Sequence, residues 1–299
     1  MHRKKYNSME LKITLTPRSP ILIKSGGISP NPSLPDMQFV RTSINGIETI
    51  YIPGSSLKGV FRSYAEKIIR TKKGETGACN ITSGDSCPEK TLKEKEREIK
   101  EKEDRKLYSN EIYKYSCKVC KVFGNTRLKG RIYFADAYPK NQVKTETRYG
   151  VAISRLTHAV AQGPFEMEVV ISGDFKSKIY LENFEIWQLG LLALVLKGLN
   201  SGLVRIGFGK NRGFGEVEVK VDKVSFMFSK KIPEGEIWGV GKFANDAERE
   251  MYGFKQDDLI RVETSPTEVD EVIFVRRDYN SKGWEVIANR AISYLGEVL

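Results

Sequence analysis

The chain has 299 residues, 40% of them hydrophobic and 29% charged, and its formal net charge is +11 at pH 7. This length provides a sizeable core in one large or two ordinary domains, and no apolar run approaches the roughly 18 residues of a membrane-spanning helix. The basic N-terminus leads into a strand-like segment, unlike a signal peptide, so we expect a soluble cytoplasmic protein. Residues 224–299 hold 10 basic and 14 acidic residues, so the basic excess lies in residues 1–223 and favours a polyanionic partner such as nucleic acid.

The N-terminal part is predicted to form strands around a long loop. Apolar and polar residues alternate from 10 to 16, which predicts a strand. Residues 17–38 are rich in Pro, Gly and Ser, and loops of this length tend to be functional or disordered. Asn45-Gly46 separates the strand-like segments 39–43 and 47–52 and predicts a hairpin turn between them.

An amphipathic helix is predicted after the following Pro-Gly turn. Ser55 or Ser56 suits its N-cap, and apolar residues then recur at helical spacing. Lys58 and Arg62 lie off the apolar face, and a helix N-terminus with a nearby lysine suits a phosphate group. On this stretch alone, an ordinary capped helix packed on a sheet is the simpler explanation.

The rest of the chain alternates between further strands and helices. Residues 71–116 resemble an insertion whose charged middle, 89–107, predicts a solvent-exposed helix. The other expected elements are strands at 130–135, 165–173, 175–181, 216–221 and 272–276, a buried helix at 184–199 and a closing helix at 284–299. The strands 165–173 and 175–181 are expected to pair as a hairpin. Helices between mostly hairpin-connected strands predict an α+β fold with ferredoxin-like packing.

Four cysteines fall in one window of the sequence. Cys117 and Cys120 form a Cys-x2-Cys pair that can grip one tetrahedral ion, and Cys79 and Cys87 add two thiolates at irregular spacing. Disulfides are not expected without a secretion signal, so we predict a structural Zn²⁺ that pins both ends of the insertion. His158 could replace one thiolate. Unligated buried cysteines are the alternative.

Residues 207–215 form a glycine-rich loop that allows close backbone approach. Lys210 and Arg212 at its tip could contact phosphates, and Phe208 and Phe214 could stack on bases or pack internally. A tight turn between strands explains the glycines as well.

A conventional active site is not evident. The chain has two histidines and no Gly-x-Ser-x-Gly elbow. Asp36 is the lone acidic residue between Glu10 and Glu48, and by itself it is typical of a solvated loop.

Together these segments resemble the RAMP superfamily of CRISPR-associated proteins. The most similar branch is the backbone subunit of type III effector complexes, which coats the guide RNA as a filament. The matching motifs run in the family's order across about residues 10–222. They are Tyr51-Ile-Pro-Gly-Ser-Ser-Leu-Lys-Gly59, Cys117-Lys-Val-Cys-Lys-Val-Phe-Gly124, Arg148-Tyr-Gly-Val-Ala-Ile-Ser-Arg155 and the loop Gly207–Gly215. Each motif alone is common, whereas the combination is specific.

The resemblance implies an architecture and a set of partners. A ferredoxin-like, RRM-like palm would occupy residues 1–223, with a zinc-bearing insertion at 71–116 and a protruding thumb hairpin at about 144–170. Residues 224–299 would form an acidic C-terminal extension. The implied partners are guide RNA, complementary target RNA, other effector subunits and copies of the chain itself, with no membrane.

The resemblance also implies which residues act. Asp36 matches a loop aspartate that promotes divalent-metal-dependent cleavage of target RNA. Its carboxylate could hold Mg²⁺ or orient the ribose 2′-hydroxyl that attacks the neighbouring phosphate. Lys58 and Arg62 would neutralise guide phosphates, with Arg41 as a helper. The complete set of expected RNA-binding residues is Arg41, Ser55, Ser56, Lys58, Arg62, Arg148, Arg155, Lys210 and Arg212.

Three alternatives stay open. A non-catalytic backbone subunit would bind guide RNA without cutting the target. A guide-precursor-processing endoribonuclease from another RAMP branch would commonly use histidine, which is scarce here. An unrelated zinc-stabilised RNA-binding protein would remain monomeric and cleave nothing.

Overall fold

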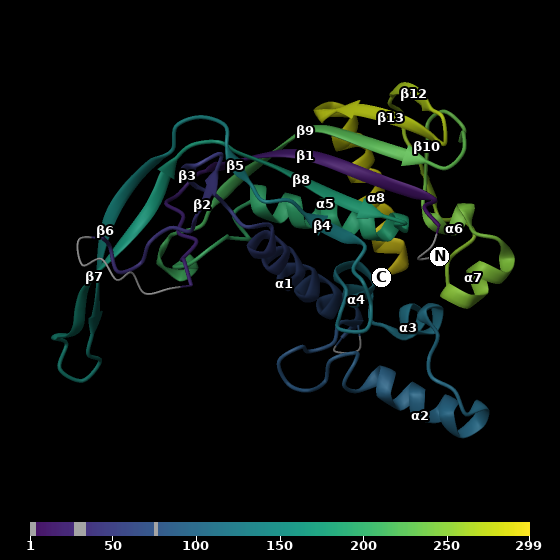
Figure 1. Cartoon of the computed structure of the whole chain (residues 1–299), viewed down its shortest axis with the longest axis horizontal. Coiled ribbons are helices and arrows are strands. Elements are labelled where there is room, and N and C mark those ends of the chain that lie inside the picture. Colours follow the sequence, from purple (N-terminus) through teal and green to yellow (C-terminus); the bar gives the residue numbers. More distant parts are fainter. Residues whose placement is uncertain (1–3, 27–33, 75–76) are drawn as a thin grey trace.

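The computed structural model describes residues 4–26, 34–74 and 77–299. Its centre is a seven-stranded antiparallel sheet in the order β12-β13-β9-β1-β8-β4, with β5 also paired with β8 (Figure 1). Its strands are β1 (Asn7–Pro17), β4 (Ile132–Phe134), β5 (Tyr138–Pro139), β8 (Phe175–Glu182), β9 (Val217–Phe228), β12 (Thr267–Glu271) and β13 (Phe274–Asn280). The expected α+β class is confirmed.

Alternation along β1 separates a core face of the sheet from a polar face. Leu11, Ile13 and Leu15 are buried, whereas Lys12 between them is exposed. The main helices lie on the apolar face and are α1 (Gly54–Lys73), α5 (Ile186–Asn200) and α8 (Ser281–Val298) (Figure 1). As predicted, α5 is buried along almost its whole length, because it lies between the sheet, α1 and α8. No helix in the described part of the chain is both long and apolar enough to cross a membrane.

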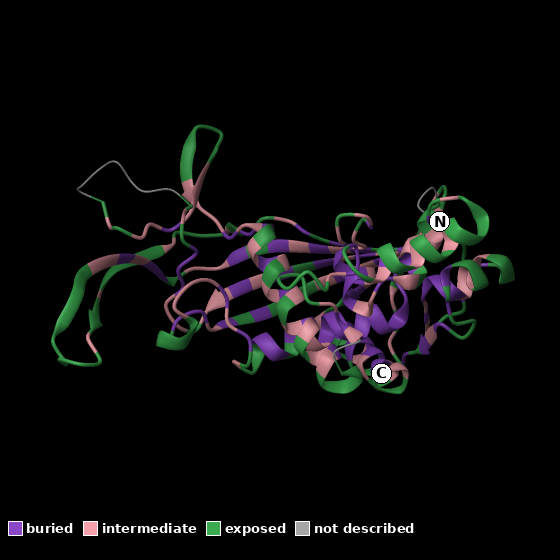
Figure 2. Cartoon of the chain, turned by 90° about the horizontal axis from the view of Figure 1, so that it is seen from below, coloured by how far each residue is buried: buried purple, intermediate pink, exposed green. Residues whose placement is uncertain are grey.

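Two hairpins project from this body (Figure 2). The shorter joins β2 (Arg41–Ile44) to β3 (Ile47–Ile50) through Asn45-Gly46, whose φ angles of 52° and 80° suit the predicted turn. The longer joins β6 (Lys144–Ile153) to β7 (Val160–Ser172), and its outer part is largely exposed.

The expected hairpin between residues 165–173 and 175–181 is wrong. β7 pairs with β6, and β8 pairs with β1 and β4. Gly173 has a φ of 138°, which favours glycine, and the Asp174 carboxylate accepts a hydrogen bond from Thr16 Oγ1 at 2.6 Å. The chain therefore turns into the central sheet at this point. Alternation identified both strands but carries little information about their partners.

In the described part of the chain between α1 and β4 there are three α-helices. They are α2 (Thr91–Glu103), α3 (Ser109–Tyr115) and α4 (Lys118–Phe123). α2 is the predicted charged helix, and Leu92 is its one fully buried residue in the described structure. Glu96 of α2 accepts two hydrogen bonds of 2.9 Å from Arg127, so an ion pair ties α2 to the segment before β4. By contrast, α4 buries Val119 and Phe123 in the main core.

The residues after 223 continue the central sheet. β9 runs through this expected boundary to Phe228, β13 pairs beside it, and α8 packs on α5. The smaller elements of this part are β10 (Glu236–Trp238), α6 (Val240–Phe243), α7 (Asp246–Tyr252) and β11 (Leu259–Arg261). The residues before and after position 223 therefore contribute to the same sheet and to the same layer of helices.

A buried carboxylate from this C-terminal part holds the start of α5. Asp258 is 1% exposed; its Oδ1 accepts a hydrogen bond from Ile186 N–H at 2.8 Å and its Oδ2 one from Gly241 N–H at 3.0 Å. Burial, followed by repulsion from Glu185, raises the pKa of Asp258 from 3.8 to about 8. Asp258 therefore stays protonated up to a higher pH in the native protein than in the unfolded chain.

We expect the contribution of Asp258 to the free energy of unfolding to fall as pH rises from about 4 to about 8, because the native state then binds more protons at Asp258 than the unfolded chain does. The contribution is up to about 1.4 kcal/mol per pH unit. Asp258→Asn should flatten this slope. The variant should also be less stable at acidic pH, because an asparagine side chain has one acceptor oxygen where the Asp258 carboxyl group has two. Urea unfolding across pH measures the slope, with the exposed Asp257→Asn as control. Equal slopes in Asp258→Asn and the native protein would contradict the assignment.

Candidate nucleic-acid interface and metal centre

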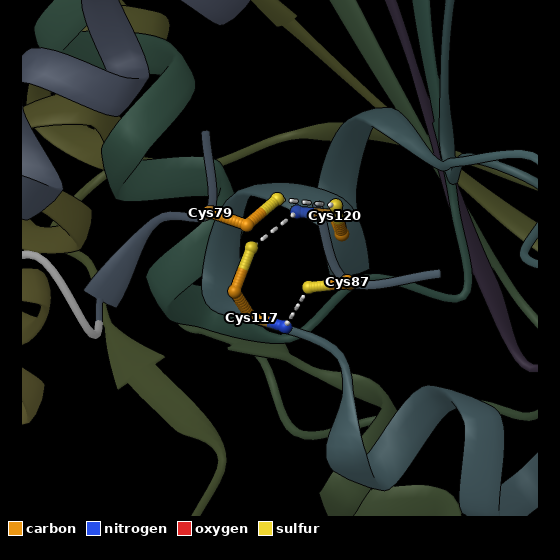
Figure 3. Close-up of side chains that lie close together, drawn as sticks. All are labelled: Cys79, Cys87, Cys117 and Cys120. Atoms are coloured by element: carbon orange, nitrogen blue, oxygen red, sulfur yellow. Dashed lines mark hydrogen bonds between the residues drawn. The ribbon is translucent and has the colours of Figure 1, made fainter. Parts of the chain in front are cut away.

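The four cysteines gather at one point in the structure (Figure 3). Cys79 and Cys87 lie between α1 and α2, and Cys117 and Cys120 lie at the start of α4. Their Sγ atoms are all within 4.8 Å of one another, and those of Cys79 and Cys120 are 3.6 Å apart. Thiolates around a tetrahedral zinc ion, at about 2.3 Å from it, stand about 3.8 Å apart. The cluster could therefore hold a metal ion and fits zinc.

Backbone and side-chain donors surround these sulfur atoms. Cys117 is the N-cap of α4, and its Sγ accepts a hydrogen bond from Cys120 N–H at 3.4 Å. Cys87 Sγ accepts one from Cys117 N–H at 3.2 Å (Figure 3). The Arg62 guanidinium lies 3.7 Å from Cys120 Sγ and also donates to Gly124 C=O at 3.0 Å. Such donors orient metal ligands and offset thiolate charge. Arg62 was expected to contact RNA, but its side chain extends from α1 to the cysteine cluster.

His158 lies outside this cluster. It is exposed in the turn between β6 and β7, with a φ of 57°, on the hairpin that projects away from α4 (Figure 1). Four thiolates complete a tetrahedral set without it. The structure therefore does not support His158 as a substitute ligand.

The N-terminus of α1 is capped differently from the prediction. The N-cap position is Pro53, and neither Ser55 nor Ser56 occupies it. Instead, Gly54 N–H donates to Asp136 Oδ1 at 2.7 Å. A Cβ at Gly54 would lie 2.2 Å from a carbonyl oxygen of β4, so glycine here allows the helix to pack closely against that strand. Ser55 is exposed and Ser56 is half-buried in the first turn.

Lys58 follows one turn into α1 and is half-buried. Partial burial, followed by repulsion from Arg62, lowers the pKa of Lys58. Within the described part of the chain, no carboxylate forms a salt bridge with Lys58. A cation without an acidic partner at the start of a helix is suited to an anionic ligand.

Residues 34–40 form the Asp36 loop, which lies along β7. The exposed Asp36 carboxylate accepts a hydrogen bond from Glu166 N–H at 2.9 Å. Met37 N–H donates to Glu166 C=O at 3.0 Å, and Glu168 N–H donates to Met37 C=O at 2.9 Å. These bonds place Asp36 about midway along the β6–β7 hairpin, where Glu166 pairs with Tyr149.

Arg41 holds the same loop in place through an ion pair with β7. Its guanidinium forms a two-pronged pair with the Glu168 carboxylate, which also accepts a hydrogen bond from Phe39 N–H at 3.0 Å. Arg41 was expected to help bind guide phosphates, but this contact gives it a structural role in the loop. The sequence offered no signal for Glu168, because its partner lies 127 positions away.

The β6–β7 hairpin carries two further arginines of the expected RNA-binding set, Arg148 and Arg155. Arg148 is exposed and forms a salt bridge with Glu146 at 2.7 Å, and Arg155 is exposed in the turn. Apolar side chains are exposed on the same hairpin, including Tyr149 at 68% and Leu156 at 94%. An exposed hairpin with apolar side chains is typical of a contact surface.

The glycine-rich loop packs against the segment that follows β1. A Cβ at Gly207 would lie 2.3 Å from Leu22 C=O, which explains the glycine there. Lys210 and Arg212 are exposed on a short 3₁₀ turn, and the Arg212 guanidinium lies 5.8 Å from the centre of the Phe165 ring. Phe214 is buried in the core, so internal packing, not base stacking, accounts for it.

Two expected site residues lie against neighbouring residues of β7. Asp36 contacts Glu166, and Arg212 lies over the adjacent Phe165. In the described ranges, only the four cysteines form a group of three or more metal-ligating side chains, so Asp36 does not belong to a larger carboxylate cluster. Mg²⁺ is often held by one or two carboxylates together with substrate phosphates, and a single exposed aspartate is compatible with that mode.

The comparisons with known proteins identify the family of the chain. A family model, the RAMP superfamily, matches residues 14–218, which is more than half of the chain. No curated protein matches the sequence significantly. The matched range extends from β1 to β9 and contains the cysteine cluster, the Asp36 loop, the β6–β7 hairpin and the glycine-rich loop. The chain therefore belongs to the RAMP superfamily of CRISPR-associated proteins.

Proposed function

We propose that this chain is a guide-RNA-binding backbone subunit of a type III CRISPR effector complex, assembled with other effector subunits and copies of itself. We also propose that it cleaves complementary target RNA through Asp36 in a divalent-metal-dependent reaction. Family membership supports the RNA-binding role. The chain order β1-α1-β4-β8-α5-β9 follows a βαββαβ pattern, which supports a ferredoxin-like palm. The β6–β7 hairpin would be the thumb, and the cysteine-containing segment the zinc-bearing insertion.

One observation carries the proposal. Asp36 and Arg212 come from loops far apart in the sequence, yet both contact residues 165–166, midway along the hairpin. A carboxylate for a divalent cation and a guanidinium for phosphate would therefore stand beside the element that enters the RNA duplex.

The chemistry expected at this point is transesterification of the RNA backbone. Asp36 would orient a ribose 2′-hydroxyl, whose oxygen forms a new bond to the neighbouring phosphorus as the bond to the 5′-oxygen breaks. The proton released from the 2′-hydroxyl reaches the departing 5′-oxygen. The products end in a 2′,3′-cyclic phosphate and a 5′-hydroxyl. A divalent cation bound at Asp36 would offset the negative charge of the phosphate.

A non-catalytic backbone subunit is the second candidate. It is favoured by the structural role of Asp36, whose Oδ2 already accepts a hydrogen bond from Glu166 N–H and holds the loop on β7. In that case guide and target RNA would bind without being cut.

Target RNA incubated with the guide-loaded assembly in Mg²⁺ or in EDTA tests the proposal. Regularly spaced cuts that need Mg²⁺ and leave cyclic phosphate ends are the expected result. Intact binding of the target without cuts would favour the non-catalytic subunit.

A further inference from the structure

A small cavity separates α1 from the loop that follows α5. Its volume is about 200 Å³. The lining comes from residues 60–67 of α1 and residues 202–210 of the loop. Sites for drug-sized ligands measure about 300–1,000 Å³, so this cavity suits a smaller group.

The cavity is lined by three cations and by no acidic residue. Lys67 comes from α1, and Arg205 and Lys210 come from the loop. Partial burial, followed by repulsion from Lys67, lowers the pKa of Lys210, which agrees with the closeness of the two ammonium groups. Among residues 4–26, 34–74 and 77–299, none of these three side chains forms a salt bridge with a carboxylate. The lining therefore holds three positive charges and no negative one, and the nearby Glu216 carboxylate lies beside Gly202 of the lining.

The walls of the cavity are held in place by ordinary packing. The Arg205 guanidinium donates a hydrogen bond to Lys210 C=O at 2.8 Å, which links the two ends of the loop. Tyr64 packs against Gly198 of α5, where a Cβ would lie 2.7 Å from its ring. Ser63 lies one turn before Lys67 on the same side of α1 and adds a hydroxyl to the lining. The cations thus converge on a preformed cavity.

We propose that this pocket binds one phosphate of a single-stranded RNA backbone. Lysine ammonium groups and the arginine fork are the side chains that best match a phosphate, and the size of the cavity admits a phosphate with its sugar. Lys67 lies about 13 Å along α1 from Lys58, so this site is separate from the one expected at the N-terminus of the helix. The identification of RNA as the ligand rests on the proposed function.

The short 3₁₀ turn connects the pocket with the Asp36 site. Lys210 lines the cavity, and Arg212, two residues later, lies over Phe165 beside the Asp36 contact. An RNA strand that crosses this turn would place one phosphate in the pocket and a later one near Arg212. The pocket would therefore set where the strand enters the site.

Binding of a fluorescent single-stranded RNA to the full chain, measured across salt concentrations, tests this inference. Lys67→Gln/Arg205→Gln should weaken binding about tenfold or more at low salt, equally for RNAs of different sequence. The slope of log K against log salt should fall by about 0.7, because one phosphate contact is lost. Lys100→Gln/Lys102→Gln on the exposed face of α2 makes the same change in charge and should leave the slope unchanged. Equal slopes in both double variants would overturn the proposal.

A second measurement separates the pocket from the proposed function. Inorganic phosphate should raise the melting temperature of the native chain and of the α2 control by more than that of Lys67→Gln/Arg205→Gln. Comparison at equal phosphate concentration removes the general stabilising effect of the salt. Equal shifts in all three proteins would overturn the pocket as an anion site. A pocket that responds to phosphate in a chain that binds no RNA would overturn both the RNA ligand and the proposed function.

Discussion

Asp36→Asn is expected to abolish target-RNA cleavage by the guide-loaded assembly while leaving guide and target binding intact. Asparagine keeps a carbonyl oxygen that can accept the hydrogen bond from Glu166 N–H, so the loop should stay on β7. It removes the negative charge that a divalent cation needs. Loss of several kcal/mol of electrostatic stabilisation corresponds to a rate decrease on the order of 10²–10³-fold or more. Gel analysis of labelled target RNA, with a parallel binding assay, measures both effects.

Two further variants sharpen this test. Asp36→Ala removes the charge and the acceptor together, so it should lose cleavage and also loosen the loop. Glu168→Gln should loosen the loop through Arg41 while Asp36 keeps its charge, and its residual cleavage should therefore exceed that of Asp36→Asn. Full cleavage by Asp36→Asn, with cuts at the same positions, would show that another residue or another subunit carries the activity.

Removal of zinc is expected to unfold the segment from residue 77 to residue 131 more than the central sheet. This segment has little core of its own, since α2 fully buries only Leu92 among its described residues. The cysteine cluster is what joins its two ends. Structural zinc contributes roughly 10–16 kcal/mol of binding free energy in zinc-finger peptides, comparable with the total stability of a domain. The α4 helix should also loosen, but less than α2, because it carries two of the four cysteines while Val119 and Phe123 pack in the main core.

Hydrogen exchange measured by peptide, before and after chelation, resolves these regions. Peptides from α2, α3 and α4 should lose protection, and those from β1, β9 and α5 should keep most of it. Cys117→Ser/Cys120→Ser should behave like the chelated protein, and added zinc should restore only the native sequence. A purified protein without metal, or uniform loss of protection across the sheet and α2, would contradict a structural zinc that serves this segment.

Much of the local structure could be predicted from the sequence, because it depends on short-range patterns. Alternation marked β1, an unbroken apolar composition marked α5 as a core helix, and Asn45-Gly46 marked the turn between β2 and β3. The Cys-x2-Cys spacing marked half of the cysteine cluster, since both thiolates lie on one turn of α4. In each case the residues that determine the feature are neighbours in the chain.

Contacts between distant segments could not be predicted in this way. The first amide of α1 is satisfied by Asp136, 82 positions away, although two serines stand nearer. Arg41 and Arg62 look like phosphate ligands in the sequence, yet one pairs with Glu168 and the other lies beside Cys120. A charged residue has the same appearance in the sequence whether its partner is internal or external.

The sequence by itself determined the type and approximate position of most elements, the four cysteines and the RAMP motifs. The tertiary structure decided which strands pair, which cations keep no internal partner, and where Asp36, Arg212 and the cationic pocket stand relative to one another. The physical reason is that periodicity and capping act over a few residues, whereas strand pairing and charge convergence depend on the path of the whole chain.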